Sequence, residues 1–255
     1  MVKFKLYASA TIYPAPGRMT KNQKMESHKI KNVVLVHGAF ADASTFKGLF
    51  WELTRKGFNV RVVQNPLTSL EDAVLATYRE LDRLDGPTVL AGHSWGGAVI
   101  TEAGNHPKVK ALVYIAAFQP DDGESALQWL ETVAPAPENG VLPPDEKGIV
   151  YYCKEKYHEG FCADVDESEA EFMCVSQGAF HAKGFATAIT NAAWRHKPSF
   201  AVIATKDKSI DPKIQRNMYK RSNTITIEVE GSHAVYMSQP KKVADLIAYA
   251  AEFPG

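Results

Sequence analysis

The chain has 255 residues, of which 45% are hydrophobic. It is therefore long enough to bury a sizeable core as one large domain and too apolar to be disordered throughout. Lysine and arginine number 29 and aspartate and glutamate number 29, so the formal net charge is zero. That balance gives no electrostatic reason to expect nucleic acid or an anionic membrane as a partner, and no apolar run approaches the roughly 20 residues of a membrane span.

The first 30 residues are interpreted as an N-terminal extension, 1–30. Lysines precede a mildly apolar stretch, 6–12, which is too short and weak for a signal peptide. A short strand at 3–7 is an option within this extension, which then becomes polar and lysine-rich before the folded domain begins.

In the first half of the chain, short apolar runs alternate with amphipathic segments. Strands are predicted at 33–36, 60–63, 89–91 and 109–117, and helices at 46–53, 70–84 and 98–103. Ser69 and Asp72 are expected to form a capping box at the start of the second helix. Continuous apolar strands alternating with amphipathic helices are typical of an α/β fold, a doubly wound and mostly parallel sheet. Such sheets bind ligands beyond the carboxyl ends of their strands.

The alternation is lost after residue 118. Proline-rich stretches and turns interrupt the range 119–194, with helices expected at 125–133, 168–174 and 182–191. We interpret 119–194, called the cap segment below, as an inserted and largely helical cap over a core formed by 31–118 and 195–255. The strand pattern returns at 198–205 and 225–229, and Pro212 and Pro240 open the last two helices.

The cap segment also contains all three cysteines. Cys153, Cys162 and Cys174 match no common zinc spacing and include no C-x-x-C pair. A disulfide between two of them remains open, but the odd number favours reduced thiols and hence a cytoplasmic location. Most aromatic side chains of the segment are expected to form its own core, and we select Trp129 and Phe180, together with Phe40 of the core, as substrate-binding residues.

The most informative stretch is Gly92-His93-Ser94-Trp95-Gly96, a G-x-S-x-G sequence between a predicted strand and a predicted helix. This context is that of a nucleophile elbow, in which a serine on a strained turn stands clear of the backbone. Residues two before and two after the serine must be small because the chain approaches itself closely. The alternative is a glycine-rich turn with an incidental serine.

A serine hydroxyl needs a base within hydrogen-bond reach, and the base needs an orienting carboxylate. Asp207 and His233 follow two later predicted strands, in the order Ser, Asp, His that α/β-hydrolases use. Asp211 competes with Asp207, but it precedes Pro212 and could instead cap a helix. His37 and His93 are expected to be structural.

An oxyanion formed beside Ser94 requires backbone donors. The Trp95 N–H at the start of the elbow helix is one candidate. The second is expected in the loop after the first strand, where the Ala39 N–H is preferred and Phe40 is the alternative.

With these residues in place, the chain resembles the α/β-hydrolase superfamily. The sequences at 34–42 (VLVHGAFAD), 64–70 (QNPLTSL), 92–97 (GHSWGG) and 204–207 (ATKD) resemble a group of small bacterial α/β-hydrolases presumed to be carboxylesterases. That group is similar in layout to plant methylesterases and hydroxynitrile lyases. The match covers about 31–251, and it implies the same nucleophile, acid, base and oxyanion donors.

Two departures limit the chemistry. Hydroxynitrile lyases of this layout usually carry a threonine after the first-loop histidine and a lysine beside the catalytic histidine, where this chain has Gly38 and, around His233, Ser232 and Ala234. A serine nucleophile instead of aspartate argues against haloalkane dehalogenase and epoxide hydrolase chemistry.

The sequence therefore predicts a serine hydrolase that cleaves carboxylic esters of small, largely apolar molecules, as a monomer or homodimer. No metal, cofactor, nucleic acid or membrane is expected to take part. Two alternatives stay open: a small-molecule receptor without turnover, and a lyase or acyltransferase that uses the same residues.

Overall fold

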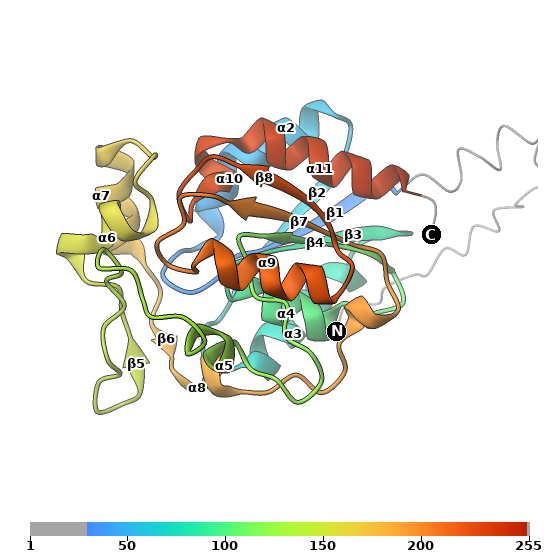
Figure 1. Cartoon of the computed structure of the whole chain (residues 1–255). Helices are drawn as coiled ribbons and strands as arrows, with labels where there is room; N and C mark the ends of the chain where they lie inside the picture. Colours follow the sequence, from blue (N-terminus) through green and yellow to red (C-terminus); the bar gives the residue numbers. More distant parts are fainter. Residues whose placement is uncertain (1–29, 254–255) are drawn as a thin grey trace, which may run out of the picture.

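Six parallel strands form the centre of the molecule (Figure 1). The structure is a computed structural model and describes residues 30–253. Their spatial order is β2-β1-β3-β4-β7-β8. The strands are β1 (Asn32–Val36), β2 (Asn59–Val63), β3 (Thr88–His93), β4 (Val109–Ile115), β7 (Ser199–Ala204) and β8 (Ile225–Val229). Every residue of β1, β3 and β7 is buried, whereas the edge strands β2 and β8 are partly exposed. Continuous apolar runs therefore mark the strands that have helices on both faces.

Helices cover both faces of the sheet, which confirms the predicted doubly wound arrangement (Figure 1). One face carries α2 (Lys47–Arg55), the short α10 (Val235–Ser238) and α11 (Pro240–Glu252), and the other carries α3 (Leu70–Asp82), α4 (Gly96–Ala103) and α9 (Pro212–Arg221). Two 3-10 turns complete these elements: η1 (Ala43–Phe46), and η2 (Ala193–Arg195) where the cap segment ends.

The parallel register brings the carboxyl ends of the strands to one edge of the sheet. Val36 at the end of β1 lies opposite Gly92 of β3, and Ile115 at the end of β4 lies opposite Val202 of β7. Since the strands are parallel, the residues that follow β1, β3, β7 and β8 gather at this edge. We call them the β1 loop (37–40), the elbow (94–96), the β7 loop (207–211) and the β8 loop (231–234).

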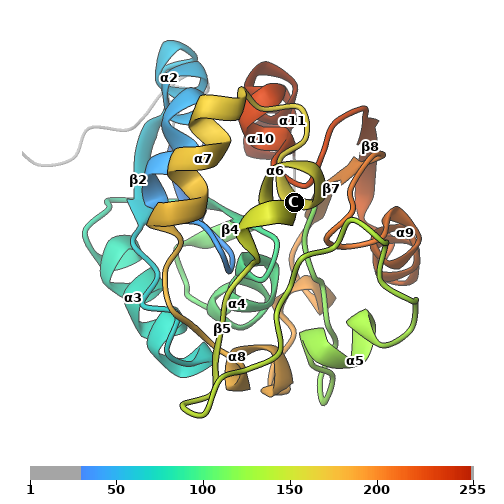
Figure 2. The ribbon, with the colours of Figure 1, turned by 90° about the vertical axis from the view of Figure 1, so that its left-hand side faces the viewer.

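The cap segment lies in front of this edge (Figure 2). It contains α5 (Ala126–Leu130), β5 (Ile149–Val150), α6 (Lys154–Phe161), α7 (Glu167–Ser176), β6 (Phe180–His181) and α8 (Lys183–Ala186). The expected helices at 125–133 and 168–174 correspond to α5 and α7. Helix α6 and the antiparallel pair β5–β6 were not expected.

The helix expected at 182–191 is wrong beyond Ala186. Thr187 is extended, and the Ile189 N–H donates to the carbonyl of Glu124 over 2.8 Å. Pairing with the chain before α5 therefore replaces the helical hydrogen bonds, a case in which tertiary contacts outweigh local propensity.

Three smaller expectations have mixed outcomes. The Ser69 side chain accepts the Asp72 N–H, as a cap requires. The Asp72 carboxylate accepts from the hydroxyl of Thr68, and within the described range no bond joins it to the backbone N–H of Ser69, which a capping box requires. The three cysteines are free thiols.

The extension at 1–30, with its strand at 3–7, lies outside the described residues apart from Ile30. No helix between residues 30 and 253 is long and apolar enough to cross a bilayer.

Candidate active site

Ser94 stands on a tight turn between β3 and α4. Its φ is 55°, in the left-handed region that non-glycine residues seldom adopt, and only 6% of its surface is exposed. A Cβ on Gly92 would collide with the carbonyl of Gly96, and a Cβ on Gly96 would collide with the carbonyl of Val36. Glycine at both positions is therefore a steric requirement of this turn, which has the geometry expected of a nucleophile elbow.

The β7 and β8 loops bring Asp207 and His233 together. The His233 Nδ1–H donates to Asp207 Oδ2 over 2.7 Å, and both side chains are buried. Asp207 Oδ2 also accepts from Gln215 Nε2 at 2.8 Å, while Oδ1 accepts the N–H groups of Ser209 and Ile210, each at 2.8 Å. Four donors thus satisfy the buried carboxylate and fix its orientation.

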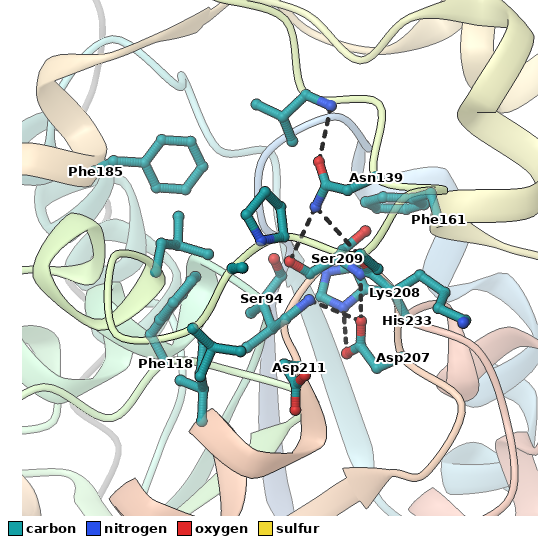
Figure 3. A pocket seen from close by; sticks show the side chains of 18 of the residues that line it. Ser94, Phe118, Asn139, Phe161, Phe185, Asp207, Lys208, Ser209, Asp211 and His233 are labelled. Carbon is teal, nitrogen blue, oxygen red and sulfur yellow. Dashed lines mark hydrogen bonds and ion pairs between the residues drawn. The ribbon is translucent and has the colours of Figure 1, made fainter.

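With its proton on Nδ1, the neutral His233 ring offers Nε2 as an acceptor. Ser94 and Asp207 lie on opposite sides of this ring (Figure 3). Among the described residues no hydrogen bond joins Ser94 Oγ to the ring, as is common in enzymes without a bound substrate. Ser94, Asp207 and His233 line the same cavity.

His93 and His37 occupy structural positions next to these groups. The His93 Nε2–H donates to the carbonyl of His233 at 2.9 Å, and its ring lies 4.6 Å from that of His233. The His37 Nδ1–H donates to the carbonyl of Gly38, and its Nε2 accepts the Asn65 N–H, both at 2.9 Å. Burial lowers the pKa of His37 and lowers that of His93 strongly, so both rings are neutral.

The β1 loop lies directly against the elbow. A Cβ placed on Gly38 would come within 2.6 Å of Ser94 Cβ and 3.0 Å of the Trp95 nitrogen. Within the described part of the chain, neither the Ala39 N–H nor the Trp95 N–H donates a hydrogen bond to another group. The two expected oxyanion donors are therefore close together and unpaired.

The cavity beside Ser94 has a volume of about 610 Å³. Four phenylalanines line it, Phe40, Phe118, Phe161 and Phe185. Aliphatic side chains from the cap segment, the β7 loop and α9 add to the wall, including Leu130, Val133, Ile210 and Ile214. Its polar rim includes Lys208, which pairs with Glu138 at 3.1 Å. A cavity of this size and composition suits a largely apolar small molecule.

Of the three expected substrate-binding residues, the structure places only Phe40 in the cavity wall. The Trp129 indole instead donates to Glu124 at 2.9 Å and stacks under the Arg221 guanidinium. Phe180 is fully buried behind the wall, with its ring 4.9 Å from Trp95 and 4.5 Å from Phe185. The cap segment carries many aromatic residues, and no sequence pattern distinguished Phe161 and Phe185 from those that form its core.

The Trp95 side chain joins the elbow to the cap segment. Its indole N–H donates to the carbonyl of Gly184 at 2.7 Å, and the ring is completely buried. The Trp95 side chain therefore anchors α8 to the elbow.

Comparisons with known proteins show which family and which proteins the chain is similar to. The family described as "Alpha/beta hydrolase family" matches residues 33–246. Over 119 residues the chain is 34% identical to a carbendazim hydrolyzing esterase of Nocardioides sp. (strain SG-4G), and this alignment covers 41% of the chain and 49% of that esterase, about half its length.

Two further similarities extend over most of the chain. It is 24% identical over 258 residues to a pyrethroid hydrolase of Sphingobium wenxiniae, with 88% of the chain and 89% of that protein aligned. The crystal structure of a pyrethroid hydrolase from Sphingobium faniae JZ-2 superposes with a TM-score of 0.74 at 22% identity, covering 88% of this chain and 98% of that one. At this identity the structural likeness establishes the fold alone.

Proposed function

The chain belongs to the alpha/beta hydrolase family, and from this premise we propose that it is a serine esterase that cleaves carboxylic esters of small, largely apolar molecules. One observation carries the proposal: a buried Asp207–His233 pair, 2.7 Å between Oδ2 and Nδ1, shares a cavity with a serine on a strained turn. The printed name of the Nocardioides relative, an esterase, supports the same reaction class.

In the proposed mechanism, His233 Nε2 takes the proton of Ser94 as the hydroxyl attacks the ester carbonyl. The Ala39 and Trp95 N–H groups hold the negative oxygen of the tetrahedral intermediate. His233 then protonates the leaving alcohol, and an acyl group remains on Ser94. A water molecule, deprotonated by the same imidazole, attacks the acyl carbon, and the imidazolium returns that proton to Ser94 Oγ as the acid leaves.

Asp207 has two roles in this scheme. Its hydrogen bond keeps the His233 proton on Nδ1, so that Nε2 faces the serine, and its charge stabilises the imidazolium that forms during the reaction. The apolar wall formed by Phe40, Phe118, Phe161 and Phe185 favours uncharged acyl or alcohol groups, because a charged group would lose its hydration there.

The test combines substitution with covalent labelling. Ser94→Ala is expected to lower kcat on short p-nitrophenyl esters by about 10⁴-fold or more. A fluorophosphonate should label the native protein at Ser94, as mass spectrometry of the digested protein would show. Ser209→Ala is the matched control, since Ser209 also lines the cavity. If the reagent reacts with Ser94 and not with Ser209, this variant should still take the label.

Undiminished ester hydrolysis by Ser94→Ala would overturn the proposal. Labelling of Ser94 without turnover, combined with a ligand that changes amide exchange in the cap segment, would favour a receptor. Transfer of the acyl group to an alcohol, or product formed without net hydrolysis, would favour an acyltransferase or lyase.

A further inference from the structure

The last turn of α6 contacts three of the loops that form the candidate site. The Tyr157 hydroxyl donates to the carbonyl of Phe40 in the β1 loop over 2.6 Å. The carbonyl of Gly160 accepts the Ser209 hydroxyl of the β7 loop at 3.0 Å, and that of Phe161 accepts the Ala234 N–H of the β8 loop at 3.1 Å. One turn of the cap segment therefore holds the loops that follow β1, β7 and β8.

The bond from Tyr157 is shielded from water. The side chain is 1% exposed, and its ring stacks on Phe161 at 5.1 Å and meets Tyr152 edge-on at 5.6 Å. Burial raises the pKa of the phenol far above its usual range, so the hydroxyl remains a neutral donor. Water cannot replace a donor at this position without disturbing the aromatic cluster.

The acceptor belongs to a strained residue. Phe40 has a φ of 62°, a left-handed conformation that is unfavourable for a bulky non-glycine residue. Such a residue persists only where its surroundings hold it. Here the neighbouring carbonyls are held as well: that of His37 accepts from Asn65 Nδ2 at 3.1 Å and that of Gly38 accepts from the His37 ring.

These bonds determine where the amide groups of the β1 loop point. Buried side-chain donors hold the carbonyls of residues 37, 38 and 40. Gly38 lies against Ser94, and the N–H of the next residue, Ala39, has no partner among the described residues. If the Phe40 carbonyl were released, its strained φ could relax and the adjacent peptide planes could rotate. A carbonyl oxygen turned toward Ser94 would repel an oxyanion.

We propose that Tyr157 is a positioning residue that holds the β1 loop in its left-handed conformation, so that the Ala39 N–H remains aimed at the oxyanion. The oxyanion hole is then complete only when α6 is docked on the core. This inference rests on the esterase function proposed above and adds a residue of the cap segment to it.

Tyr157→Phe removes only the hydroxyl and tests the inference. We expect kcat on p-nitrophenyl esters to fall about 10- to 100-fold, less than or comparable to the loss of one oxyanion donor. KM should change by less than about threefold, because the ground-state carbonyl depends little on the hole. The inhibition constant of a trifluoromethyl ketone, which forms an oxyanion on the serine, should rise in parallel with the fall in kcat.

Tyr219→Phe is the matched control. Tyr219 is equally buried, on the α9 side of the sheet and away from the β1 loop. Its hydroxyl donates to the backbone carbonyl of Ala117 at 2.7 Å and accepts the N–H of the same residue at 3.0 Å. This variant should lose at least as much thermal stability and keep kcat within about threefold. A kcat unchanged by Tyr157→Phe, or a loss that Tyr219→Phe reproduces, would overturn the inference.

Ser94→Ala, measured in the same assay, separates the two proposals. If it abolishes hydrolysis while Tyr157→Phe leaves kcat and ketone inhibition unchanged, the esterase function stands and the positioning role fails. If Ser94→Ala leaves hydrolysis undiminished, the esterase function itself fails.

Discussion

Two aspartates, four residues apart, have separate roles at the end of β7. Asp207 is buried and accepts four hydrogen bonds, one of them from His233. Asp211 is the N-cap of α9, and its carboxylate accepts the Lys213 N–H at 2.7 Å. The sequence already favoured Asp207 as the partner of the histidine and allowed Asp211 as the cap. It did not indicate Gln215, because nothing in its position on α9 marks it as a donor to Asp207.

The two aspartates should respond differently to the same substitution. Asp207→Asn is expected to lower kcat by about 10⁴-fold, because an amide in this position favours the wrong histidine tautomer. Asp211→Asn keeps a good N-cap and should leave kcat within about threefold and the free energy of unfolding within about 0.5 kcal/mol. Steady-state kinetics and urea denaturation would check both, and a larger kcat loss for Asp211→Asn would reverse the assignment.

At the scale of elements, the core could be predicted from the sequence and the cap segment could not. Buried strands such as β1, β3 and β7 appear as continuous apolar runs, and these lead directly to the loops of the site. Helix α6 buries only Tyr157, Gly160 and Phe161, at its C-terminal end, so it lacks a repeating apolar face. The strands β5 and β6 have two residues each, too few for any periodicity. Packing between distant segments determines which aromatic rings line the cavity.

The junction of β3 and α4 gives a prediction about glycine. Gly96→Ala places a Cβ against the carbonyls of Val36 and His37 and should reduce the free energy of unfolding by about 3 kcal/mol or more, or prevent folding. Gly48→Ala is the contrasting change. Gly48 lies in α2, and a Cβ there would make only ordinary contacts, with Pro240 at 3.7 Å. It should stabilise the protein by up to about 1 kcal/mol. Similar denaturation midpoints for the two variants would contradict this account.

The whole molecule buries two neutral histidines behind its site, and this links its stability to pH. The pKa of His37 and that of His93 lie below their ordinary value of 6.5 because burial disfavours the charged ring. Below pH 6.5 the unfolded chain protonates these histidines while the folded chain does not. The unfolded state then binds more protons, so the free energy of unfolding decreases as the pH falls.

Urea denaturation at pH 7.5 and pH 5.5 measures this effect. The free energy of unfolding should be lower at pH 5.5, by at most about 1.4 kcal/mol for each histidine that stays neutral in the folded state. His93→Asn should reduce the difference between the two pH values, even if the variant is less stable overall. A difference that His93→Asn leaves unchanged would show that other groups dominate between these pH values.

The sheet order also has a consequence for how the chain folds. Strands β1 to β4 can assemble through short crossovers, but β7 and β8 join them only where Leu112–Ile115 pairs with Ser199–Val202. Closing the long loop between Ile115 and Ser199 costs chain entropy before this pairing of β4 with β7, called the seam below, can form. Ser94 lies on one side of the seam, and Asp207 and His233 lie on the other. If the proposed esterase function holds, a nascent chain can complete the turn at Ser94 during synthesis and still be inert toward esters, because the proposed acid and base arrive only when β7 and β8 join the sheet.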